Sequence, residues 1–394
     1  PGGQPPGATR QRMRNQGQMG RMARAGAQSY SKAEVVCYLA SCPQPLKRSR
    51  DNRRALTGRP PLEGGPIRPA SALGRLWTAA GIGAIKADFE GMHDTWHAWE
   101  PGPLGRVNRM LPTGEPFSVP PSIYPLIVKG KVLAAQSGDL FNPAIGSLIA
   151  LWGFHRGDPS GSQPPSADQI DRLVATDPRM SDLILDGIRL YSTNPAVQLD
   201  FGAFGKGYAI DLAIRHLRDL GVKNAIVNAG GDLRAIGSRA GHPWRVAIRR
   251  PSGGGVFATI DVQGDESVFT SGDYERNFVF EGRTYHHIID PRTGRPARGT
   301  RAVTVVHSDA ITADAAVTAL FIAGPEAWEE VAKAMGIRYV LLLDSAGILH
   351  MNPAMAQRIK LLDAGLETRI SAPLHQDRLA APATEGSDAT RPGN

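Results

Sequence analysis

Two adjacent histidines stand at the end of an apolar run. His286 and His287 precede Ile-Ile and an Asp-Pro-Arg-Thr-Gly turn at residues 290–294. A short strand that delivers an imidazole into a rigid turn is a common setting for general-base chemistry. Neighbouring strand residues point to opposite faces, so only one of the two can face a given pocket. The competing interpretation is a structural strand histidine.

A carboxylate and a hydroxyl follow in the next apolar segment. Asp314 and Thr318 are four residues apart, which puts them on one face of a helical turn. Two oxygen ligands placed in this way suit a hard cation such as Mg²⁺. The pair could also be an ordinary helix-surface pair. With the histidines, it predicts a base beside a magnesium site.

Three glycine-bearing turns lie upstream of these residues. In Asp-Phe-Gly-Ala-Phe-Gly-Lys-Gly-Tyr-Ala-Ile-Asp (200–211), Lys206 stands between two glycines at the start of a helix, where backbone N–H groups and an ammonium would suit a phosphate. A glycine turn with a surface lysine is the alternative, because the segment matches no Walker loop or dinucleotide fingerprint. Asn-Ala-Gly-Gly-Asp (228–232) and Thr-Ser-Gly-Asp-Tyr (270–274) are either ligand turns or tight bends, the first with Asp232 capping amides.

An α+β order of elements must position these residues. Apolar periodicity predicts helices over residues 72–94, 122–137, 142–151, 208–220, 313–323 and 328–335. Short β-type runs predict strands over residues 198–201, 224–227, 244–248, 257–262, 268–270, 276–280, 284–289, 303–306 and 339–343. The N-terminal half is therefore expected to be helix-rich, and strands alternate with helices after residue 189.

The positive charge is concentrated at one end of the chain. Residues 1–70 contain thirteen Lys/Arg and three Asp/Glu, so the net charge of this segment is +10. Since the net charge of the whole chain is +8, the remaining residues carry −2. The Gly, Pro and Gln content of residues 1–70 predicts a disordered or leader segment, and a tether to nucleic acid or an anionic membrane is the less favoured alternative, so no nucleic-acid partner is expected. Residues 71–372 are expected to form the functional domain, and residues 373–394 a flexible tail.

The two cysteines, Cys37 and Cys42, both lie in this first segment. The expected domain therefore contains neither a disulfide nor a thiolate metal site. The Leu-Ala-Ser-Cys at 39–42 resembles a bacterial lipoprotein cleavage site, which would give a lipid anchor, and a chance match is the alternative. No run of about 18 apolar residues occurs, so no membrane-spanning helix is expected.

The order of the motifs resembles the ApbE family, the FAD:protein FMN transferases. The resemblance also includes Ser-Gly-Asp-Leu-Phe-Asn-Pro (137–143) and Leu-Trp-Gly-Phe (151–154), and it extends from about residue 93 to residue 355. It implies an ApbE-like (T-fold-like) arrangement of mixed sheets with packed helices. It also implies Mg²⁺-dependent transfer of the FMN half of FAD to a threonine hydroxyl of an acceptor protein, with release of AMP.

The resemblance carries over to individual residues. It implies that His287 is the base that activates the threonine. It implies that FAD is contacted by Trp99, Leu140, Phe141, Asn142, Asp200, Lys206 and Ile289. Asn142 stands where the family usually has Asp. It implies that Mg²⁺ is held by the side chains of Asp314 and Thr318 and by the main-chain oxygens of Ala203 and Val317.

The implied acceptor is typically a membrane-associated redox subunit. Because family members commonly work outside the cytoplasm as lipoproteins, the resemblance favours the periplasmic face of the inner membrane, and a cytoplasmic location stays open. Two other function classes also stay open. One is a Mg²⁺-dependent FAD pyrophosphatase that gives the diphosphate bond to water. The other is a flavin-binding module without catalytic turnover.

Overall fold

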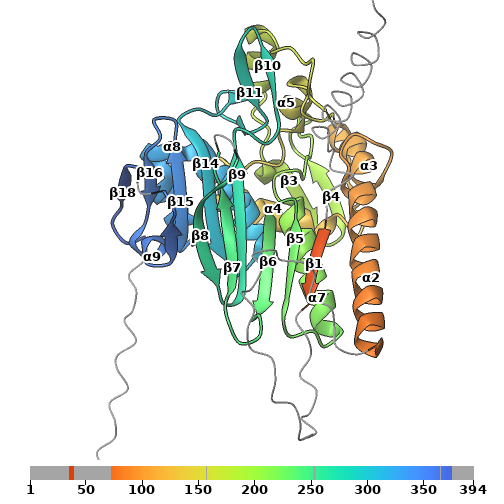
Figure 1. The fold of residues 1–394 in the computed structure, drawn as a ribbon. Helices are drawn as coiled ribbons and strands as arrows, with labels where there is room; N and C mark the ends of the chain where they lie inside the picture. The colour runs from red at the N-terminus through yellow and green to blue at the C-terminus, as the bar shows by residue number, and fades with distance from the viewer. Residues whose placement is uncertain (1–34, 40–71, 157, 252–253, 364, 375–394) are drawn as a thin grey trace, which may run out of the picture.

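The largest element of the fold is an eight-stranded sheet (Figure 1). The computed structural model describes residues 35–39, 72–156, 158–251, 254–363 and 365–374. Every neighbouring pair of strands in the sheet is antiparallel except the last. In spatial order the strands are β1 (Val35–Leu39), β5 (Ala225–Ala229), β6 (Asp232–Gly237), β9 (Gly264–Gly272), β14 (Thr300–His307), β15 (Tyr339–Asp344), β16 (Leu349–Met351) and β18 (Thr368–Ile370).

The central strands are apolar on both faces. In β14, Val303 and Val305 belong to one core cluster, whereas Ala302 and Val306 belong to a second. Since successive side chains point to opposite sides of a strand, such a run requires a cover on each side of the sheet. Helices α7 (Gly205–Asp219) and α8 (Ala310–Ala334) contact the strands on the first side. A three-stranded sheet covers the second, with β7 (Trp244–Arg249), β8 (Val256–Val262) and β17 (Ile359–Leu361).

The N-terminal half of the described chain is helix-rich, as predicted. Its helices are α2 (Ala72–Trp96), α3 (Pro103–Met110), α4 (Tyr124–Gln136), α5 (Gly146–Leu151) and α6 (Ala167–Val174). A small sheet accompanies them, with strands β2 (Phe117–Ser118), β4 (Arg189–Ser192) and β3 (Leu183–Asp186). The sequence analysis did not identify α3 or α6. The α+β fold class is confirmed.

Helix α8 runs through the core and bends once. Gly324 has φ 72° and ψ −178°, outside the helical region, and Pro325 follows it. The two predicted helices over 313–323 and 328–335 are the parts before and after this kink. Among the described residues, α8 is also the one helix whose length and mean hydropathy of 1.2 would suffice to cross a membrane. Since 67% of that stretch is buried inside the protein, α8 is a core helix here.

A protruding hairpin stands beside the main sheet (Figure 1). Its strands are β10 (Asn277–Phe280) and β11 (Arg283–His286). Phe278 stacks on Tyr285 with ring centroids 5.3 Å apart, and both pack in a third apolar cluster with Trp152. The Trp152 Nε1–H donates to the carbonyl of Gly294 at 2.7 Å. These contacts tie the hairpin, and the histidines at its end, to the helix-rich half.

Two predicted strands are wrong in detail. Residues 198–201 make only an isolated bridge between Gln198 and Ile145. The chain turns at Asp200, whose Oδ1 accepts the Gly202 N–H at 2.7 Å, so no ladder forms. Residues 284–289 split into β11 and β12 (Ile289–Asp290), which pairs with β13 (Arg295–Pro296).

Within residues 1–70, predicted as a disordered or leader segment, the structure describes residues 35–39. These residues form β1, which pairs with β5 along its whole length. Val-Val-Cys-Tyr-Leu is rich in β-branched and aromatic residues, which favours a strand. The remainder of 1–70, Cys42 included, and residues 375–394 of the predicted tail lie outside the described residues.

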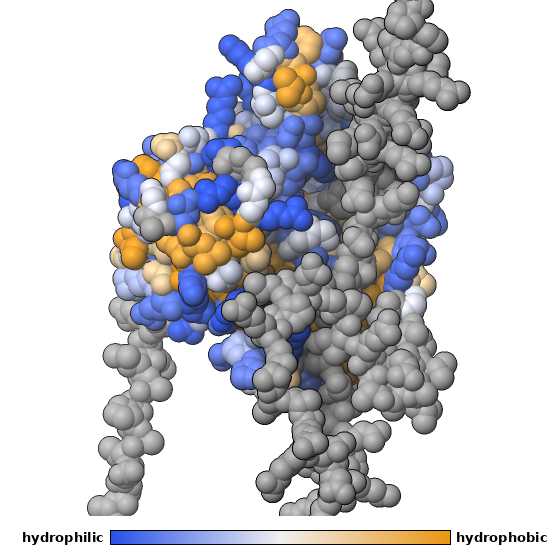
Figure 2. Space-filling model, in the orientation of Figure 1, coloured by the Kyte–Doolittle hydropathy of each residue, from blue (hydrophilic) through white to orange (hydrophobic). Residues whose placement is uncertain are grey.

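The centre of the sheet should dominate stability. Phe269 in β9 is completely buried, so Phe269→Ala is expected to lower the free energy of unfolding by about 3–5 kcal/mol. Val279 is the matched control, because it is 64% exposed on the β10–β11 hairpin, where apolar surface is visible (Figure 2). Val279→Ala should change the free energy by no more than about 0.5 kcal/mol. Urea unfolding of both variants measures this difference, and equal losses would contradict the assignment of the core.

Candidate active site

One cavity of about 400 Å³ gathers the predicted functional residues. It lies where the end of α2, the start of α7, the first turns of α8 and the turn after β11 meet. Among the sequence-predicted site residues, those that line it are Trp99, Leu140, Phe141, Asn142, Asp200, Ala203, Lys206, His287, Ile289, Asp314 and Thr318. Val317 is buried within α8 and is not among the lining residues.

Trp99 and His155 form an aromatic wall of the cavity. The Trp99 ring packs against the ring of His155 at a centroid distance of 5.4 Å, and Trp99 Nε1–H donates to Asp200 Oδ2 at 3.3 Å. Burial, with Arg156 acting in the same direction, lowers the pKa of His155. The wall therefore presents two flat rings and one carboxylate, which suits a planar heteroaromatic ligand.

The Leu140–Phe141–Asn142 segment is held by short local bonds. Ser137 Oγ accepts the Phe141 N–H at 3.1 Å. The Asn142 amide donates to the Pro178 carbonyl at 2.8 Å and accepts the Ala144 N–H at 3.0 Å. Since both ends of this amide already have protein partners, Asn142 orders the loop that lines the cavity. An aspartate could not make the bond to Pro178, because an ionised carboxylate has no donor.

Lys206 lies in the first turn of α7, and its ammonium forms an ion pair with Asp232. Asp232 is buried after the glycine turn, and its Oδ1 also accepts the Thr270 N–H at 3.0 Å. Asp232 therefore accepts a backbone N–H of β9 and also holds the lysine. Gly205 and Lys206, the first two residues of α7, both line the cavity, and the Lys206 ammonium supplies the positive charge that an anion site requires.

Asp314 and Thr318 lie one turn apart on α8 and line the same cavity, so they are not a surface pair. The Gly207 N–H donates to Asp314 Oδ2 at 2.8 Å. Burial raises the pKa of Asp314 to about 8; Lys206 opposes the rise, and Asp232 and Glu275 add to it.

This surplus of carboxylates is what a divalent cation would neutralise. Among the described residues, no group of three His, Cys, Asp or Glu side chains has the arrangement of a metal site. A cation here would therefore depend on one carboxylate, a hydroxyl, main-chain oxygens and the oxygens of a bound phosphate, which is the usual environment of Mg²⁺. The residues fit Mg²⁺ in this sense.

The two histidines have different surroundings. His287 lines the cavity, and its Nδ1 is 3.2 Å from the Arg276 carbonyl. A carbonyl can only accept, so Nδ1 carries the proton and Nε2 keeps its lone pair. Burial, followed by the positive charge of Arg276, lowers the pKa of His287 to about 3, so the ring is neutral at physiological pH.

His286 points away from the cavity into the protein. It is buried, its Nε2 lies 2.9 Å from the Ala297 carbonyl and its Nδ1 accepts the Ile288 N–H at 3.3 Å. Its ring meets Phe321 edge to face at 5.4 Å. The expectation that only one of the two histidines faces a pocket agrees with this geometry, and the cavity histidine is His287.

Sequence reasoning missed further cavity residues, among them His155, Glu275 and Arg276. His155 directly follows the Leu-Trp-Gly-Phe motif, and Glu275 and Arg276 directly follow Thr-Ser-Gly-Asp-Tyr. Arg276 donates to the Arg156 carbonyl at 3.1 Å, which joins the β10–β11 hairpin to the aromatic wall. The available signal was position, since each residue extends a motif by one or two places.

Comparison with known proteins gives a consistent family. The model of the ApbE family matches residues 72–341. A FAD:protein FMN transferase of Rhodobacter capsulatus is 40% identical over 294 residues, which cover 74% of this chain and 55% of that protein, so this chain spans about half the length of that relative.

Two solved structures are similar to most of the described chain. The ApbE protein of Thermotoga maritima MSB8 has a TM-score of 0.66 at 31% identity and covers 71% of this chain and 91% of that one. The Pseudomonas stutzeri flavinyl transferase ApbE in its apo form has a TM-score of 0.62 at 31% identity, covering 71% and 88%. With the family model matching residues 72–341 and the cavity assembled from the motifs within them, this chain belongs to the ApbE family.

Proposed function

We propose that this protein transfers the FMN half of FAD to a threonine hydroxyl of an acceptor protein. The observation that carries the proposal is the single cavity in which the neutral imidazole of His287 shares space with Lys206, Asp314 and Thr318. The names of the relatives, FAD:protein FMN transferase and flavinyl transferase, support the same reaction. The aromatic wall at Trp99 would receive a flat ring of FAD, and the Lys206 end would receive the diphosphate.

The reaction divides between the residues of the cavity. The threonine oxygen attacks the phosphorus of the FMN half, a P–O bond to it forms, and the P–O bond to the AMP half breaks, so that AMP leaves. His287 Nε2 accepts the proton of the threonine hydroxyl. Lys206, in the first turn of α7, stabilises charge on the phosphate oxygens.

Mg²⁺ would be held by the Asp314 carboxylate, the Thr318 hydroxyl and the main-chain oxygens of Ala203 and Val317. When bound, Mg²⁺ would neutralise the negative charge that develops on the transferring phosphate. Asp314 is kept in place for this role by the Gly207 N–H. The cluster of Asp232, Glu275 and Asp314 against one lysine is the feature that favours a cation here.

Incubation with FAD, MgCl₂ and an acceptor domain modified by another ApbE-family flavin transferase tests this function. We expect the acceptor to become covalently fluorescent in a denaturing gel, and the same domain with its target threonine changed to alanine to stay dark. Free FMN without labelled protein would identify a pyrophosphatase instead. Neither product would identify a flavin-binding module.

The acceptor and the location stay predictions from the family resemblance. A membrane-associated redox subunit is the proposed acceptor, and the periplasmic face of the inner membrane is the proposed location, with a cytoplasmic location still open. A lipid anchor would require cleavage before Cys42. Mass spectrometry of the N-terminus of the protein isolated from its host distinguishes a lipidated Cys42 from an unprocessed chain.

A further inference from the structure

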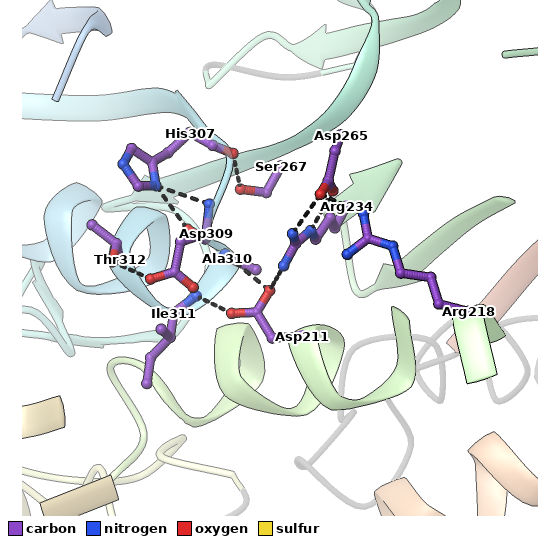
Figure 3. Close-up of polar contacts among 10 residues, drawn as sticks. All are labelled: Asp211, Arg218, Arg234, Asp265, Ser267, His307, Asp309, Ala310, Ile311 and Thr312. Carbon is purple, nitrogen blue, oxygen red and sulfur yellow. Dashed lines mark hydrogen bonds and ion pairs between the residues drawn. The ribbon is translucent and has the colours of Figure 1, made fainter. Parts of the chain in front are cut away.

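A buried carboxylate outside the cavity joins three elements that the proposed reaction depends on. Asp211 lies on α7, is only 9% exposed and is not among the residues that line the cavity. Figure 3 shows it between the start of α8 and the side chain of Arg234. A buried charge is retained only where it is well paired and hydrogen-bonded, so its partners indicate what it does.

The partners of Asp211 are the first N–H groups of α8. Its Oδ1 accepts from Ala310 N at 3.1 Å, and its Oδ2 accepts from Ile311 N at 3.0 Å. The opening N–H groups of a helix have no partner within the helix, and a residue at the N-cap position usually satisfies one. Here Asp309 makes no such bond, and its Oδ2 instead accepts from the Thr312 hydroxyl at 2.6 Å. Asp211 therefore caps α8 from another helix.

The same face of α7 touches α8 one turn away. Gly207 precedes Asp211 by four residues, so both lie on one side of the helix. The Gly207 N–H donates to Asp314 Oδ2 at 2.8 Å, and a Cβ on Gly207 would lie 2.3 Å from the Ala310 carbonyl oxygen. The backbones of the two helices are thus in close contact. Gly207 of α7 holds Asp314, and Asp211, one turn later on α7, holds the start of α8.

The cap is anchored to the main sheet. Arg234 of β6 forms an ion pair with Asp211 and a bidentate pair with Asp265 of β9, with Nε–Oδ1 2.8 Å and Nη2–Oδ2 2.9 Å. Arg218 of α7 pairs with Asp265 as well. The side chain of Arg234 is 12% exposed, so its charge is compensated inside the protein by Asp211 and Asp265.

We propose that Asp211 is a positioning residue of the phosphate and cation site: by capping α8 from α7, it fixes Asp314 and Thr318 opposite Lys206. The inference rests on the proposed function in one respect, namely that Asp314 and Thr318 hold a divalent cation. Lys206 immediately precedes Gly207 on α7, and Asp314 follows Ala310 by one turn on α8. A shift of α8 along α7 would separate the ammonium from the carboxylate without changing any residue that lines the cavity.

Asp211→Asn is the informative variant. An asparagine can accept with one oxygen only, so one of the two α8 N–H groups loses its acceptor, and its NH₂ group meets that N–H donor or the guanidinium of Arg234 as well as the neighbouring Asp309 carboxylate. Asp265→Asn is the matched control, because it disturbs the same network at Arg234, while the hydrogen bonds of Asp265 go to Arg234 and Arg218 and not to α8. Asp314→Ala is the reference for a lost metal ligand.

Binding of Mn²⁺, followed by the loss of the free-ion EPR signal with and without FAD, is the readout. We expect Asp211→Asn to weaken Mn²⁺ binding by about 10- to 100-fold, as is typical when a group that orients a metal ligand is lost. The Mn²⁺ affinity of Asp265→Asn should stay within about 3-fold of the wild-type affinity. This should hold even if its thermal midpoint falls as far as the midpoint of Asp211→Asn. This difference separates positioning from stability alone.

Normal Mn²⁺ binding by Asp211→Asn, or equal losses in Asp211→Asn and Asp265→Asn, would overturn the inference. If Asp314→Ala also bound Mn²⁺ normally, the cation site of the proposed function would be wrong and the inference would fall with it. If Asp211→Asn does not fold, Asp211→Glu takes its place, since it keeps the charge for Arg234 and displaces the carboxylate by one methylene. Weakened Mn²⁺ binding in that variant supports the inference, and unchanged binding contradicts it.

Discussion

Asp314→Ala is expected to abolish flavin transfer and to leave the fold intact. Asp314 is the one proposed Mg²⁺ ligand with a charged side chain, and losing charge stabilisation at a transferring phosphate commonly costs several kcal/mol of barrier. The fold should persist because burial disfavours the charged form of Asp314, as its pKa of about 8 shows. Initial rates of acceptor labelling over a range of MgCl₂ concentrations, with the thermal midpoint of each variant, measure both effects.

Thr318 offers a matched pair of controls for the same site. Thr318→Ser keeps the hydroxyl and should retain most of the transfer rate, whereas Thr318→Val keeps the shape and should lose it. Transfer by Asp314→Ala at the wild-type rate in the presence of EDTA would contradict the Mg²⁺ assignment. Equal rates for the two Thr318 variants would remove the hydroxyl from the ligand set.

His287→Ala is expected to lower transfer by about 10²–10⁴-fold, the usual effect of losing a general base. FAD binding should be retained, because His287 is proposed to act on the hydroxyl of the acceptor and not on the diphosphate. His286→Ala should affect transfer far less, since His286 faces Phe321 and Ala297 and not the cavity. Single-turnover labelling at saturating FAD, with bound FAD measured for each variant, makes the comparison.

The pH dependence gives a second readout for His287. Its pKa is lowered from 6.5 to about 3, chiefly by burial, so the neutral form that can accept a proton persists as the pH falls. At saturating MgCl₂, where bound metal would keep Asp314 ionised, the acid limb of the single-turnover profile should therefore lie well below pH 6.5. If His286 proved essential and His287 tolerated alanine, the base assignment would be reversed.

The sequence could predict the site residues that lie in short motifs. Lys206, His287 and Asp314 each lie at the start or end of an element, where a few neighbouring residues determine the local structure. Their convergence on one cavity was inferred from the family resemblance, because no local pattern connects residues that are about a hundred positions apart. Val317 was assigned through its main-chain oxygen, and its position inside α8 is set by helix packing that no motif encodes.

Other features depend on tertiary contacts that no local pattern contains. Asp211 lies in the recognised segment 200–211, yet its partner Ala310 is 99 residues away. The turn at Asp200 depends on a side-chain bond to Gly202 that competes with strand pairing. The strand β1 was overlooked because its residues follow a basic stretch, and its partner β5 is almost two hundred residues later. In each case, a distant part of the chain determines the local structure.

Tandem mass spectrometry of the acceptor tests the central claim most directly. After incubation of the protein with FAD, MgCl₂ and the acceptor domain, the proposed reaction predicts one peptide whose threonine carries FMN through a phosphoester, with one AMP released for each FMN attached. An acceptor that remains unmodified while FAD is converted to FMN and AMP would contradict flavin transfer, and would assign the cavity to hydrolysis.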